Sequence, residues 1–460
     1  MMELKGKKVL VVGLGKSGLA AALFLRHRGA QVTVSDVRSA EALAKDIPAL
    51  LDEGIMVETG GHGLLTFRRQ DLIVVSPGVP LNTPELAQVK SFGLPVIGEL
   101  ELAARFLKGR TLAITGSNGK TTTTALVGEI LQKAGIPTLV GGNIGVPVVE
   151  LIDQSTDETW SVLEVSSFQL ESTERFHPRI GVILNITPDH LDRHGSFENY
   201  ALAKERIFAA QNESDVVVLN ADNARAAQAA VRSVGRVYFF SVEHSVMQGA
   251  WVEDGLLVYR AGKDEPKEKI MPLKHVPLKG AHNVENVLAA VCASRLAGVS
   301  AEQIRSGVEA FKAVEHRLEF VAKVDGVDFY NDSKATNVDA TAKALASFSS
   351  GIHLILGGRD KDSDYRQLAE LLRARVRAIY TIGSAAAKTE SQLRGVVPIL
   401  SSETLDNAVN AAASAARPGE VVLLAPACSS FDQFENYEQR GRVFKELVSQ
   451  WRGGKEWQHA

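Results

Sequence analysis

A glycine-rich stretch, Thr115-Gly116-Ser117-Asn118-Gly119-Lys120-Thr121-Thr122, follows the apolar run 112–114 and precedes a helical pattern of apolar residues. A buried strand, a glycine turn ending in Lys-Thr and a helix together are typical of a site for nucleotide phosphates. Backbone N–H groups of such a turn surround phosphate oxygens, and the helix directs its positive end at them. Lys120 would neutralise the terminal phosphates, and the Thr121 hydroxyl would coordinate Mg²⁺. We therefore expect ATP or GTP to bind here.

The stretch departs from the general P-loop pattern at one position. That pattern has a glycine six residues before the lysine, where this chain has Ile114. A glycine turn without a ligand is the alternative, and the strand–turn–helix context favours the nucleotide site over it.

Bulk properties exclude several classes of protein. A chain of 460 residues exceeds one hydrophobic core and predicts about three domains. The formal net charge of −3 gives no excess of positive charge for binding phosphate backbones, so we expect no nucleic-acid partner. The apolar run 9–12 is too short for a signal peptide or a membrane span, and we expect no membrane partner. Cys292 and Cys428 make neither a disulfide framework nor a zinc site by themselves, which indicates a cytoplasmic protein.

Three segments each open with a strand, a turn and a helix. This alternation predicts an α/β protein with a Rossmann-like N-terminal domain (residues 1–98), a central P-loop domain built on a parallel sheet (99–313) and a Rossmann-like C-terminal domain (314–460). Besides the strand before the P-loop, the expected strands are 8–12, 32–35, 71–75, 161–165, 180–185, 327–331, 352–356, 378–382 and 420–424.

The N-terminal segment contains a second glycine motif, Gly13-x-Gly15-x-x-Gly18, and Asp36 closes the next strand. Alone, this pattern would predict an NAD-dependent dehydrogenase with Asp36 on the ribose. The motif shows only that a phosphate or pyrophosphate can approach a helix N-terminus, so a UDP-sugar fits it equally. A turn kept for tight strand–helix packing is the third alternative.

Three polar groups follow strands in the central segment. Asn143 lies in the turn Gly141–Gly145, Glu164 ends an apolar strand, and His190 follows the strand 180–185. In open α/β sheets, ligands bind beyond the carboxyl ends of the strands. A carboxylate near a nucleotide site is a suitable ligand for Mg²⁺, which prefers hard oxygen donors.

Together with these features, further motifs make the chain resemble the Mur ligases along its whole length, and the departure at Ile114 is itself the form of the P-loop in that family. The motifs are Gly142-Asn143-Ile144-Gly145, Glu164-Val165-Ser166-Ser167-Phe168-Gln169-Leu170-Glu171, Asp189-His190-Leu191-Asp192-Arg193-His194, Gly280-Ala281-His282-Asn283-Val284-Glu285-Asn286, Glu315-His316-Arg317, Asn331-Asp332-Ser333-Lys334-Ala335-Thr336-Asn337 and Pro426-Ala427-Cys428-Ser429-Ser430-Phe431-Asp432-Gln433-Phe434.

The resemblance is strongest to the member that adds D-glutamate. The N-terminal Gly13–Gly18 domain with Ser76-Pro77-Gly78, the segment 166–170 and the segment 429–434 indicate that member. The arginine motif of the diaminopimelate-adding relative is not apparent. Folylpolyglutamate synthases share the central and final domains but lack the N-terminal one, so residues 1–98 argue against them.

The resemblance implies an ATP-dependent ligase of peptidoglycan precursor synthesis, and thereby of cell wall biogenesis, cell shape and cell division. Such a ligase activates the carboxylate of UDP-N-acetylmuramoyl-L-alanine as an acyl phosphate, which the amine of D-glutamate attacks. It implies ATP and two Mg²⁺ ions as cofactors, and we expect a monomer. Because the negatively charged carboxylate must approach the negatively charged γ-phosphate of ATP, the site needs a high density of positive charge.

The resemblance also implies site residues. For catalysis they are Lys120, Glu164, His190, Lys204 and Lys334, with Lys204 carbamylated, and for the metals Thr121, Glu164, His190 and the Lys204 carbamate. For ATP they are Gly116, Ser117, Asn118, Gly119, Lys120, Thr121, Thr122, Asn283, Arg317 and Asp332. For the UDP-sugar they are Ser17, Asp36, Arg38, Gly78, Asn143, Ser166, Gln169 and His190. For D-glutamate they are Thr336, Lys361, Ser430 and Tyr437.

Two points qualify this set. Without the resemblance, Lys204 reads as a solvated lysine on a helix face. Tyr437 stands where the family often has phenylalanine, and a contact through its backbone would tolerate that change. Because Arg317 and Asp332 begin the third domain, we expect that domain to close over ATP and exclude water from the acyl phosphate.

A nucleotide-dependent switch without ligation is the alternative from another class. Lys334 and Lys361 argue against it, because they place positive charge over an acceptor that a switch does not need.

Overall fold

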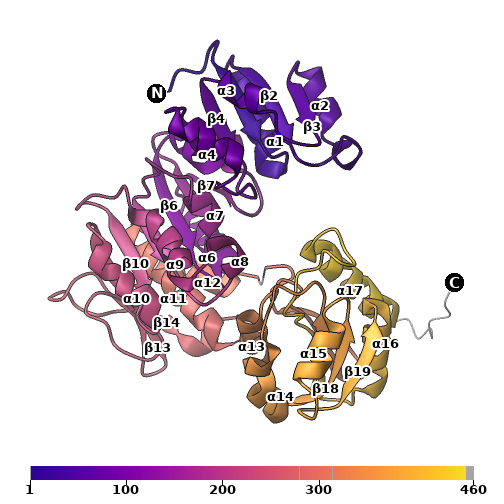
Figure 1. Cartoon of the computed structure of the whole chain (residues 1–460). Coiled ribbons are helices and arrows are strands. Elements are labelled where there is room, and N and C mark those ends of the chain that lie inside the picture. The colour runs from indigo at the N-terminus through magenta and orange to yellow at the C-terminus, as the bar shows by residue number, and fades with distance from the viewer. Residues whose placement is uncertain (1, 279, 313, 452–460) are drawn as a thin grey trace. The chain divides into compact units, whose positions relative to one another are not determined.

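The computed structural model describes residues 2–278, 280–312 and 314–451. The chain folds as two compact units, the first running to His275 and including Glu285–Ala310, the second comprising Val276–Val284 and the chain from Phe311 on. Three sheets with mainly parallel strands carry the fold, two in the first unit and one in the second (Figure 1). The expected α/β class is confirmed.

The first sheet is parallel throughout, in the order β3-β2-β1-β4-β5. Its strands are β1 (Lys8–Val12), β2 (Gln31–Asp36), β3 (Met56–Thr59), β4 (Leu72–Val75) and β5 (Val96–Gly98), and its helices are α1 (Lys16–His27), α2 (Ile47–Asp52), α3 (Leu64–Arg68) and α4 (Pro84–Ser91). The order reverses at β1, so β1, β2 and β4 end side by side, with the glycine turn after β1, Asp36 as the last residue of β2 and Ser76 after β4.

The second sheet has the order β14-β13-β12-β11-β10-β9-β6-β8-β7. Its strands are β6 (Arg110–Thr115), β7 (Thr138–Gly142), β8 (Trp160–Glu164), β9 (Ile180–Ile183), β10 (Val216–Asn220), β11 (Arg236–Ser241), β12 (Gly249–Glu253), β13 (Leu256–Arg260) and β14 (Glu268–Pro272). The helices of this part are α5 (Glu99–Ala104), α6 (Lys120–Lys133), α7 (Ser167–Leu170), α8 (Leu191–His194), α9 (Phe197–Glu205), α10 (Ala224–Gln228), α11 (Ala281–Leu296) and α12 (Ala301–Ala310), with the 3₁₀ helix η2 (Val148–Gln154).

The third sheet has the order β15-β16-β20-β17-β18-β19, and only β15 runs antiparallel to its neighbour. Its strands are β15 (Glu319–Val324), β16 (Val327–Asn331), β17 (Ile352–Gly357), β18 (Val376–Ile382), β19 (Ile399–Glu403) and β20 (Val421–Leu424). Its helices are α13 (Val338–Ala346), α14 (Ala369–Arg375), α15 (Ala386–Gln392), α16 (Leu405–Ala415) and α17 (Tyr437–Trp451).

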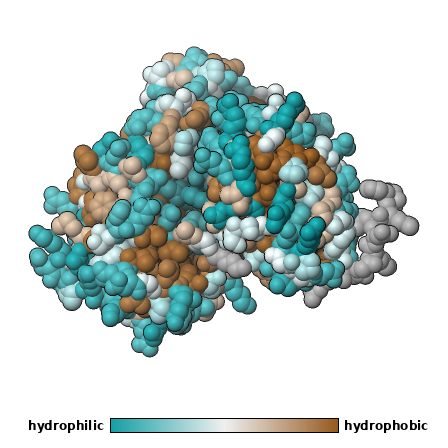
Figure 2. All heavy atoms as spheres, turned by 90° about the horizontal axis from the view of Figure 1, so that it is seen from below, coloured by the Kyte–Doolittle hydropathy of each residue, from teal (hydrophilic) through white to brown (hydrophobic). Residues whose placement is uncertain are grey.

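Alternation along the strands builds a core on both faces of a sheet. In β1, Val9 and Val11 pack into one apolar cluster, whereas Leu10 and Val12 pack into another. A strand buried on both faces reads as a continuous apolar run, and this is how the sequence reveals β1. On the face shown in Figure 2, hydrophobic residues lie in separate areas among hydrophilic ones, as is ordinary for a globular protein.

Each expected strand corresponds to a strand of the structure, with ends shifted by a few residues. The expected strands did not include β3, β5, β7, β10, β11, β15 or β19, nor the antiparallel extension β12–β14 of the second sheet. Strands β12 and β14 mix polar with apolar residues and lack the continuous apolar run of a parallel strand.

The first two sheets share one apolar cluster within the first unit. Helix α1 packs against η2 and α5, and the rings of Phe24 and Phe106 meet edge to face at 5.4 Å between centroids. Arg28 forms an ion pair with Asp153 across the same boundary. This shared core fixes the glycine turn of α1 to the second sheet.

Glu99 is a buried carboxylate at this boundary. Its Oε1 accepts a hydrogen bond from the Val149 N–H at 3.0 Å, and its Oε2 is buried without a hydrogen-bond partner. Burial raises the pKa of Glu99 from 4.5 to about 7, against the effect of the bonded N–H groups. Between pH 4.5 and 7, the folded protein therefore holds a proton on Glu99 that the unfolded chain releases.

Stability is expected to fall between pH 4.5 and 7 because of Glu99. Below pH 4.5 both states are protonated, whereas above pH 7 the folded state must hold a buried charge, at a cost on the order of 3 kcal/mol. Glu99→Gln keeps the acceptor for Val149 and removes this titration. Urea midpoints measured at pH 5 and pH 8 should fall less for the variant than for the wild type. An equal fall in both proteins would contradict the assignment.

Candidate active site

The P-loop adopts the geometry expected of it. It follows β6, and Gly119, in the left-handed region at φ 88°, caps α6. The Lys120 Nζ donates hydrogen bonds to the carbonyl oxygens of Gly116 at 2.8 Å and Ser117 at 3.0 Å. The ammonium thus lies over the loop, where phosphates would meet the N-terminus of a fourteen-residue helix.

Side chains from other elements hold the loop in shape. The Asn185 Oδ1 accepts from the Asn118 N–H at 2.9 Å, and its Nδ2 donates to the Asn118 carbonyl at 3.1 Å. The Ser117 hydroxyl donates to the Thr187 carbonyl at 2.9 Å and lies 3.0 Å from the Tyr200 hydroxyl. Sequence reasoning missed Asn185 and Tyr200, although Asn185 is the last residue of the expected strand 180–185.

Glu164 joins two loops at the carboxyl edge of the second sheet. Its Oε2 accepts from the Thr121 hydroxyl at 2.7 Å, and its Oε1 accepts from the Asn143 Nδ2 at 3.0 Å. Because β7, β8 and β6 are neighbours in the sheet, their ends bring these three residues together. A carboxylate beside a hydroxyl at a phosphate loop is a donor set of hard oxygens, which suits Mg²⁺.

Lys204 is buried, with 1% of its surface exposed, so the interpretation as a solvated lysine is wrong. Its Nζ donates to the Gly116 carbonyl at 2.9 Å and lies 4.5 Å from the centre of the Tyr200 ring. Burial and then the neighbouring Lys120 charge lower the pKa of Lys204 well below its ordinary value, against the opposing effect of Asp189 and Glu164. This environment favours the uncharged amine.

His190 has a left-handed backbone (φ 53°) between β9 and α8. Its N–H donates to the Asp189 Oδ1 at 3.0 Å, and its ring meets the Phe168 ring edge to face at 4.9 Å. A non-glycine residue in this conformation is strained, which is common at functional sites. Asp189, which the sequence analysis did not select, also faces Lys204 electrostatically.

The glycine turn of the first sheet is packed too tightly for side chains. A Cβ on Gly18 would lie 2.0 Å from the Gly13 carbonyl oxygen, and the Ser76 hydroxyl donates to that oxygen at 2.6 Å. Gly18 therefore allows α1 to approach β1, and Ser76 joins the third neighbouring strand end to the turn. This packing role leaves the turn compatible with a ligand at the N-terminus of α1.

Asp36 and Arg38 pair with each other beside that turn. Asp36 accepts from the Leu14 N–H at 2.6 Å and from two guanidinium nitrogens of Arg38 at 3.0 Å each, and Arg38 donates to the Leu14 carbonyl at 2.7 Å. Burial alone would raise the pKa of Asp36, but the Arg38 pair and the bonded N–H groups lower it to about 2. The carboxylate is thus charged and holds the loop, while half of the Arg38 side chain is exposed.

Helix α7 holds two of the expected UDP-sugar residues. Ser166 and Gln169 form a capping box, in which the Ser166 hydroxyl accepts from the Gln169 N–H at 3.2 Å and the Gln169 Oε1 accepts from the Ser166 N–H at 3.0 Å. This reciprocal cap fixes the turn between β8 and α7. Ser17, in α1, and Gly78, in the loop after β4, belong to the elements of the first sheet.

Three loops of the second unit follow adjacent parallel strands. Thr336 follows β16, Ser430 follows β20 and Lys361 follows β17. Backbone bonds join the loops: Arg359 and Ser429 exchange N–H···O bonds of 2.9 and 3.1 Å, and the Ala427 N–H donates to the Ala335 carbonyl at 2.8 Å. The structure thus brings the loops of three of the four expected D-glutamate residues to one edge, and the fourth, Tyr437, begins α17.

Arg440 is a buried residue that sequence reasoning missed. Its guanidinium donates to the Ser333 hydroxyl at 2.9 Å, to the Ser333 carbonyl at 2.6 Å and to the Cys428 carbonyl at 3.2 Å. It thereby ties the loop after β16 to the loop after β20. Burial lowers its pKa to about 10, so it stays charged near neutral pH. The sequence shows only an arginine on an amphipathic helix, which is usually solvated.

The remaining expected residues of the second unit surround the loop after β16. Asp332 accepts from the Leu318 N–H at 3.2 Å, and burial raises its pKa to about 6 against the opposing effect of Arg317. The Lys334 Nζ lies 4.8 Å from the centre of the Tyr437 ring, and the Ser333 hydroxyl donates to the Tyr437 carbonyl at 2.9 Å.

Helix α11 begins with two asparagines one turn apart. Asn283 is buried, and its N–H donates to the Gly280 carbonyl at 3.0 Å. Asn286 reaches the P-loop, because a Cβ on Gly119 would lie 2.2 Å from the Asn286 Oδ1. The left-handed backbone of Gly119 favours glycine there, and the Asn286 amide lies against it. Asn286 lies three residues after Asn283, on the same face of the helix, and this spacing could have indicated it.

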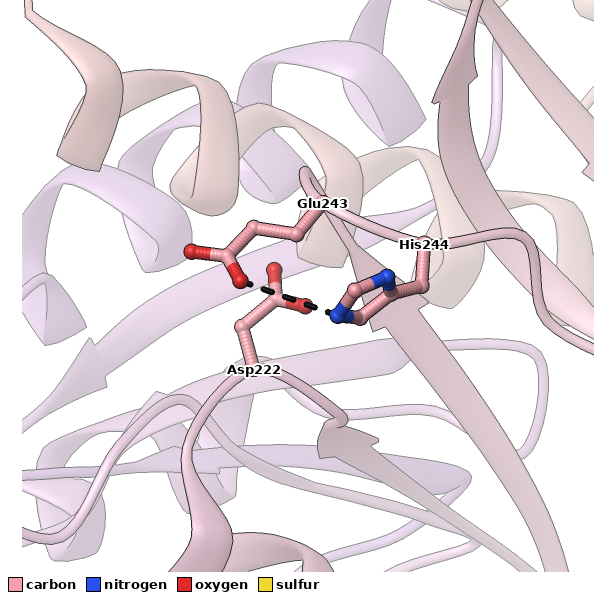
Figure 3. A group of neighbouring side chains, drawn as sticks. All are labelled: Asp222, Glu243 and His244. Atoms are coloured by element: carbon pink, nitrogen blue, oxygen red, sulfur yellow. Dashed lines mark ion pairs between the residues drawn. The ribbon is translucent and has the colours of Figure 1, made fainter.

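Two further groups of carboxylates and histidines occur among the described residues. Figure 3 shows Asp222, Glu243 and His244, whose candidate ligand atoms lie within 4.8 Å of one another. Asp222 already accepts from the Ser241 hydroxyl and the Val242 N–H. In the other group, Lys445 pairs with both Glu315 and Glu319. Asp222, Glu315 and Glu319 thus already have partners in the protein.

Comparison with known proteins agrees with the geometry. The chain matches the N-terminal domain of MurD-like Mur ligases over residues 7–98, the Mur ligase middle domain over 114–294 and the glutamate ligase domain of Mur ligases over 316–428. Among the described helices, none has both the length and the apolar character of a membrane span.

Curated relatives match along the whole chain. A UDP-N-acetylmuramoylalanine–D-glutamate ligase of Acidobacterium capsulatum is 70% identical, with all of both chains covered. One of Koribacter versatilis is 60% identical over 97% of this chain and 98% of the relative. Among solved structures, the UDP-N-acetylmuramate-alanine ligase MurC of Thermotoga maritima has a TM-score of 0.61 at 20% identity, covering 98% of this chain and 100% of its own. That likeness shows the fold.

Mur ligases catalyse ATP-dependent ligation in peptidoglycan precursor synthesis and use Mg²⁺. The sequence identity to the curated relatives extends over the full length, and all three domain models match in order. The chain belongs to the Mur ligase family.

Proposed function

We propose that the protein joins D-glutamate to UDP-N-acetylmuramoyl-L-alanine, with ATP converted to ADP and phosphate through an acyl phosphate. The observation that carries this proposal is the position of Glu164, which bonds the P-loop residue Thr121 and the amide of Asn143 at once. A nucleotide site and the expected UDP-sugar site thereby share one carboxylate. The names of the 70% and 60% identical relatives supply the substrates.

The P-loop of residues 116–122 is the proposed ATP site, with Lys120 opposite the terminal phosphates. Thr121, Glu164, His190 and Lys204 would hold the Mg²⁺ ions, of which we propose two. Bound Mg²⁺ supplies positive charge that lets a carboxylate approach a phosphate. Asn283, Arg317 and Asp332 complete the proposed nucleotide residues, and Lys334 adds charge for the acyl transfer.

Lys204 is proposed to act as a carbamate. Only an uncharged amine attacks CO₂, and burial together with Lys120 favours that form of Lys204. A carbamate offers oxygens to a metal, whereas an ammonium repels it. The burial of this amine, which the resemblance alone did not require, supports the assignment.

The UDP-sugar is proposed to lie along the first unit, from Ser17, Asp36, Arg38 and Gly78 at the first sheet to Asn143, Ser166, Gln169 and His190 at the second. D-glutamate is proposed to bind the second unit through Thr336, Lys361, Ser430 and Tyr437. The domain roles follow: residues 1–98 for the UDP-sugar, 99–313 for ATP and 314–460 for closure and the amino acid.

Phosphate release is expected only when ATP, UDP-N-acetylmuramoyl-L-alanine and D-glutamate are all present. Omission of each substrate in turn, and a panel of other amino acids and UDP-muramoyl acceptors, would test this, with the product mass as a second readout. Steady ATP hydrolysis without an acceptor would favour a switch. A thermal shift with NAD would instead favour the dehydrogenase alternative for the Gly13 motif.

Lys204→Ala should abolish most ligation, and formate or acetate should restore part of it by supplying oxygens at the metal. Turnover with and without the acids measures this, and Lys133→Ala, which changes an exposed lysine at the end of α6, is the control. Full activity of the Lys204 variant would refute the carbamate, and a loss without rescue would count against it.

Ser430→Ala should raise the KM for D-glutamate about tenfold or more, because it removes a hydrogen bond to a carboxylate worth about 1.5–3 kcal/mol. The KM values for ATP and the UDP-sugar should change little. Ser347→Ala is the matched control, since this serine follows the far end of α13 and its hydroxyl donates to the Lys343 carbonyl. If the Ser430 variant weakened only ATP or UDP-sugar binding, the D-glutamate assignment would be wrong.

A further inference from the structure

Arg193 of α8 contacts both parts of the first unit. Its guanidinium donates to the carbonyl oxygens of Gly78 at 3.3 Å and Val79 at 2.9 Å, in the loop after β4. It also bonds Glu171 at 3.0 Å and lies 5.0 Å from the centre of the Phe168 ring. One mostly buried side chain thus joins the first sheet to the loops of the second.

The loop that Arg193 holds packs directly on the glycine turn. A Cβ on Gly13 would lie 2.7 Å from the Val79 Cγ2, and the Ser76 hydroxyl bonds the Gly13 carbonyl. A shift of Val79 would therefore move the turn that carries Ser17.

On its other side, Arg193 reaches the residues around His190. The Phe168 ring contacts both the Arg193 guanidinium and the His190 ring. Glu171 bonds Arg193 through one oxygen and His194 through the other, at 3.0 Å each, and the His194 Nε2 lies 3.1 Å from the Ser167 hydroxyl. The guanidinium therefore has a charge partner, a ring and two carbonyls in fixed directions, which a lysine could not match.

We propose that Arg193 is a positioning residue that sets the distance between the two halves of the UDP-sugar site. This inference rests on the proposed function, since it takes Ser17 and Gly78 as one half and His190 as the other. Arg193 itself needs no contact with substrate. It holds the Ser76–Val79 loop at a fixed place relative to Phe168 and His190, so that one ligand spans both sheets.

A cavity beside Arg193 offers a specific test. It has a volume of about 440 Å³ and is lined by Arg193 together with Leu81, Asn82, Asn199 and Arg206, among others. In Arg193→Ala, a guanidinium ion from solution can enter this cavity and take the place of the lost group. Rescue by guanidinium separates the loss of this cation from a general loss of structure.

The experiment compares Arg193→Ala and Arg193→Lys with the wild type. Binding of UDP-N-acetylmuramoyl-L-alanine, measured by calorimetry without ATP, and the KM of each substrate are the readouts. The Kd and KM for the UDP-substrate should rise about tenfold in Arg193→Ala and less in Arg193→Lys, while the KM for ATP stays unchanged. Guanidinium chloride, kept well below unfolding concentrations, should recover part of the affinity in Arg193→Ala only.

Arg28→Ala is the matched control, because Arg28 also links the two parts of the unit through Asp153, away from the Ser76–Val79 loop. It should leave the KM for the UDP-substrate unchanged. Wild-type affinity in Arg193→Ala, an equal rise in the KM for ATP, or an equal effect of Arg28→Ala would overturn the proposal. A wild type that binds no UDP-substrate would refute the proposed function itself, and the role of Arg193 with it.

Discussion

Glu164 accepts one hydrogen bond from the hydroxyl of Thr121, which follows the P-loop lysine, and another from the amide of Asn143, so one carboxylate ties together the two loops on which the proposed site depends. The contact exists because β6, β8 and β7 are parallel neighbours, whose carboxyl ends open at one edge. The backbone is adapted to it. A Cβ on Gly142 would lie 2.2 Å from the Glu164 carbonyl oxygen, so only a glycine lets the strands end this close together.

The same principle recurs in the other two sheets. Ser76 reaches the glycine turn from the neighbouring strand end, and Arg440 ties two loop carbonyls in the second unit. In each case a buried polar side chain forms hydrogen bonds with the backbone of a loop. Loops at these edges would otherwise have few apolar contacts, so such bonds restrict their motion before any ligand arrives.

Local sequence was sufficient for ten of the strands, the two glycine turns and several residues at strand ends. Apolar runs and glycine spacing determine those features within a few residues, so Glu164 and Asn143 could be placed from the sequence. Lys204 and Arg440 could not, since each occupies a helix position that the sequence alone reads as solvated. Their burial depends on which loop the fold brings over the helix. The strands β12–β14 were not identified either: β12 and β14 mix polar with apolar residues, whereas the apolar run 256–259 of β13 was not used.

The Gly116 carbonyl accepts hydrogen bonds from two amines, Lys120 at 2.8 Å and Lys204 at 2.9 Å. Two ammonium groups would repel each other there, and the charge of Lys120 contributes to the low pKa of Lys204. A nucleotide that draws Lys120 toward its phosphates weakens this repulsion and so raises the proton affinity of Lys204. Linkage is reciprocal, so loss of the proton from Lys204 would change nucleotide affinity by the factor by which the nucleotide changes the proton affinity of Lys204. The protonation of one buried amine and the occupancy of the phosphate loop are thus thermodynamically linked.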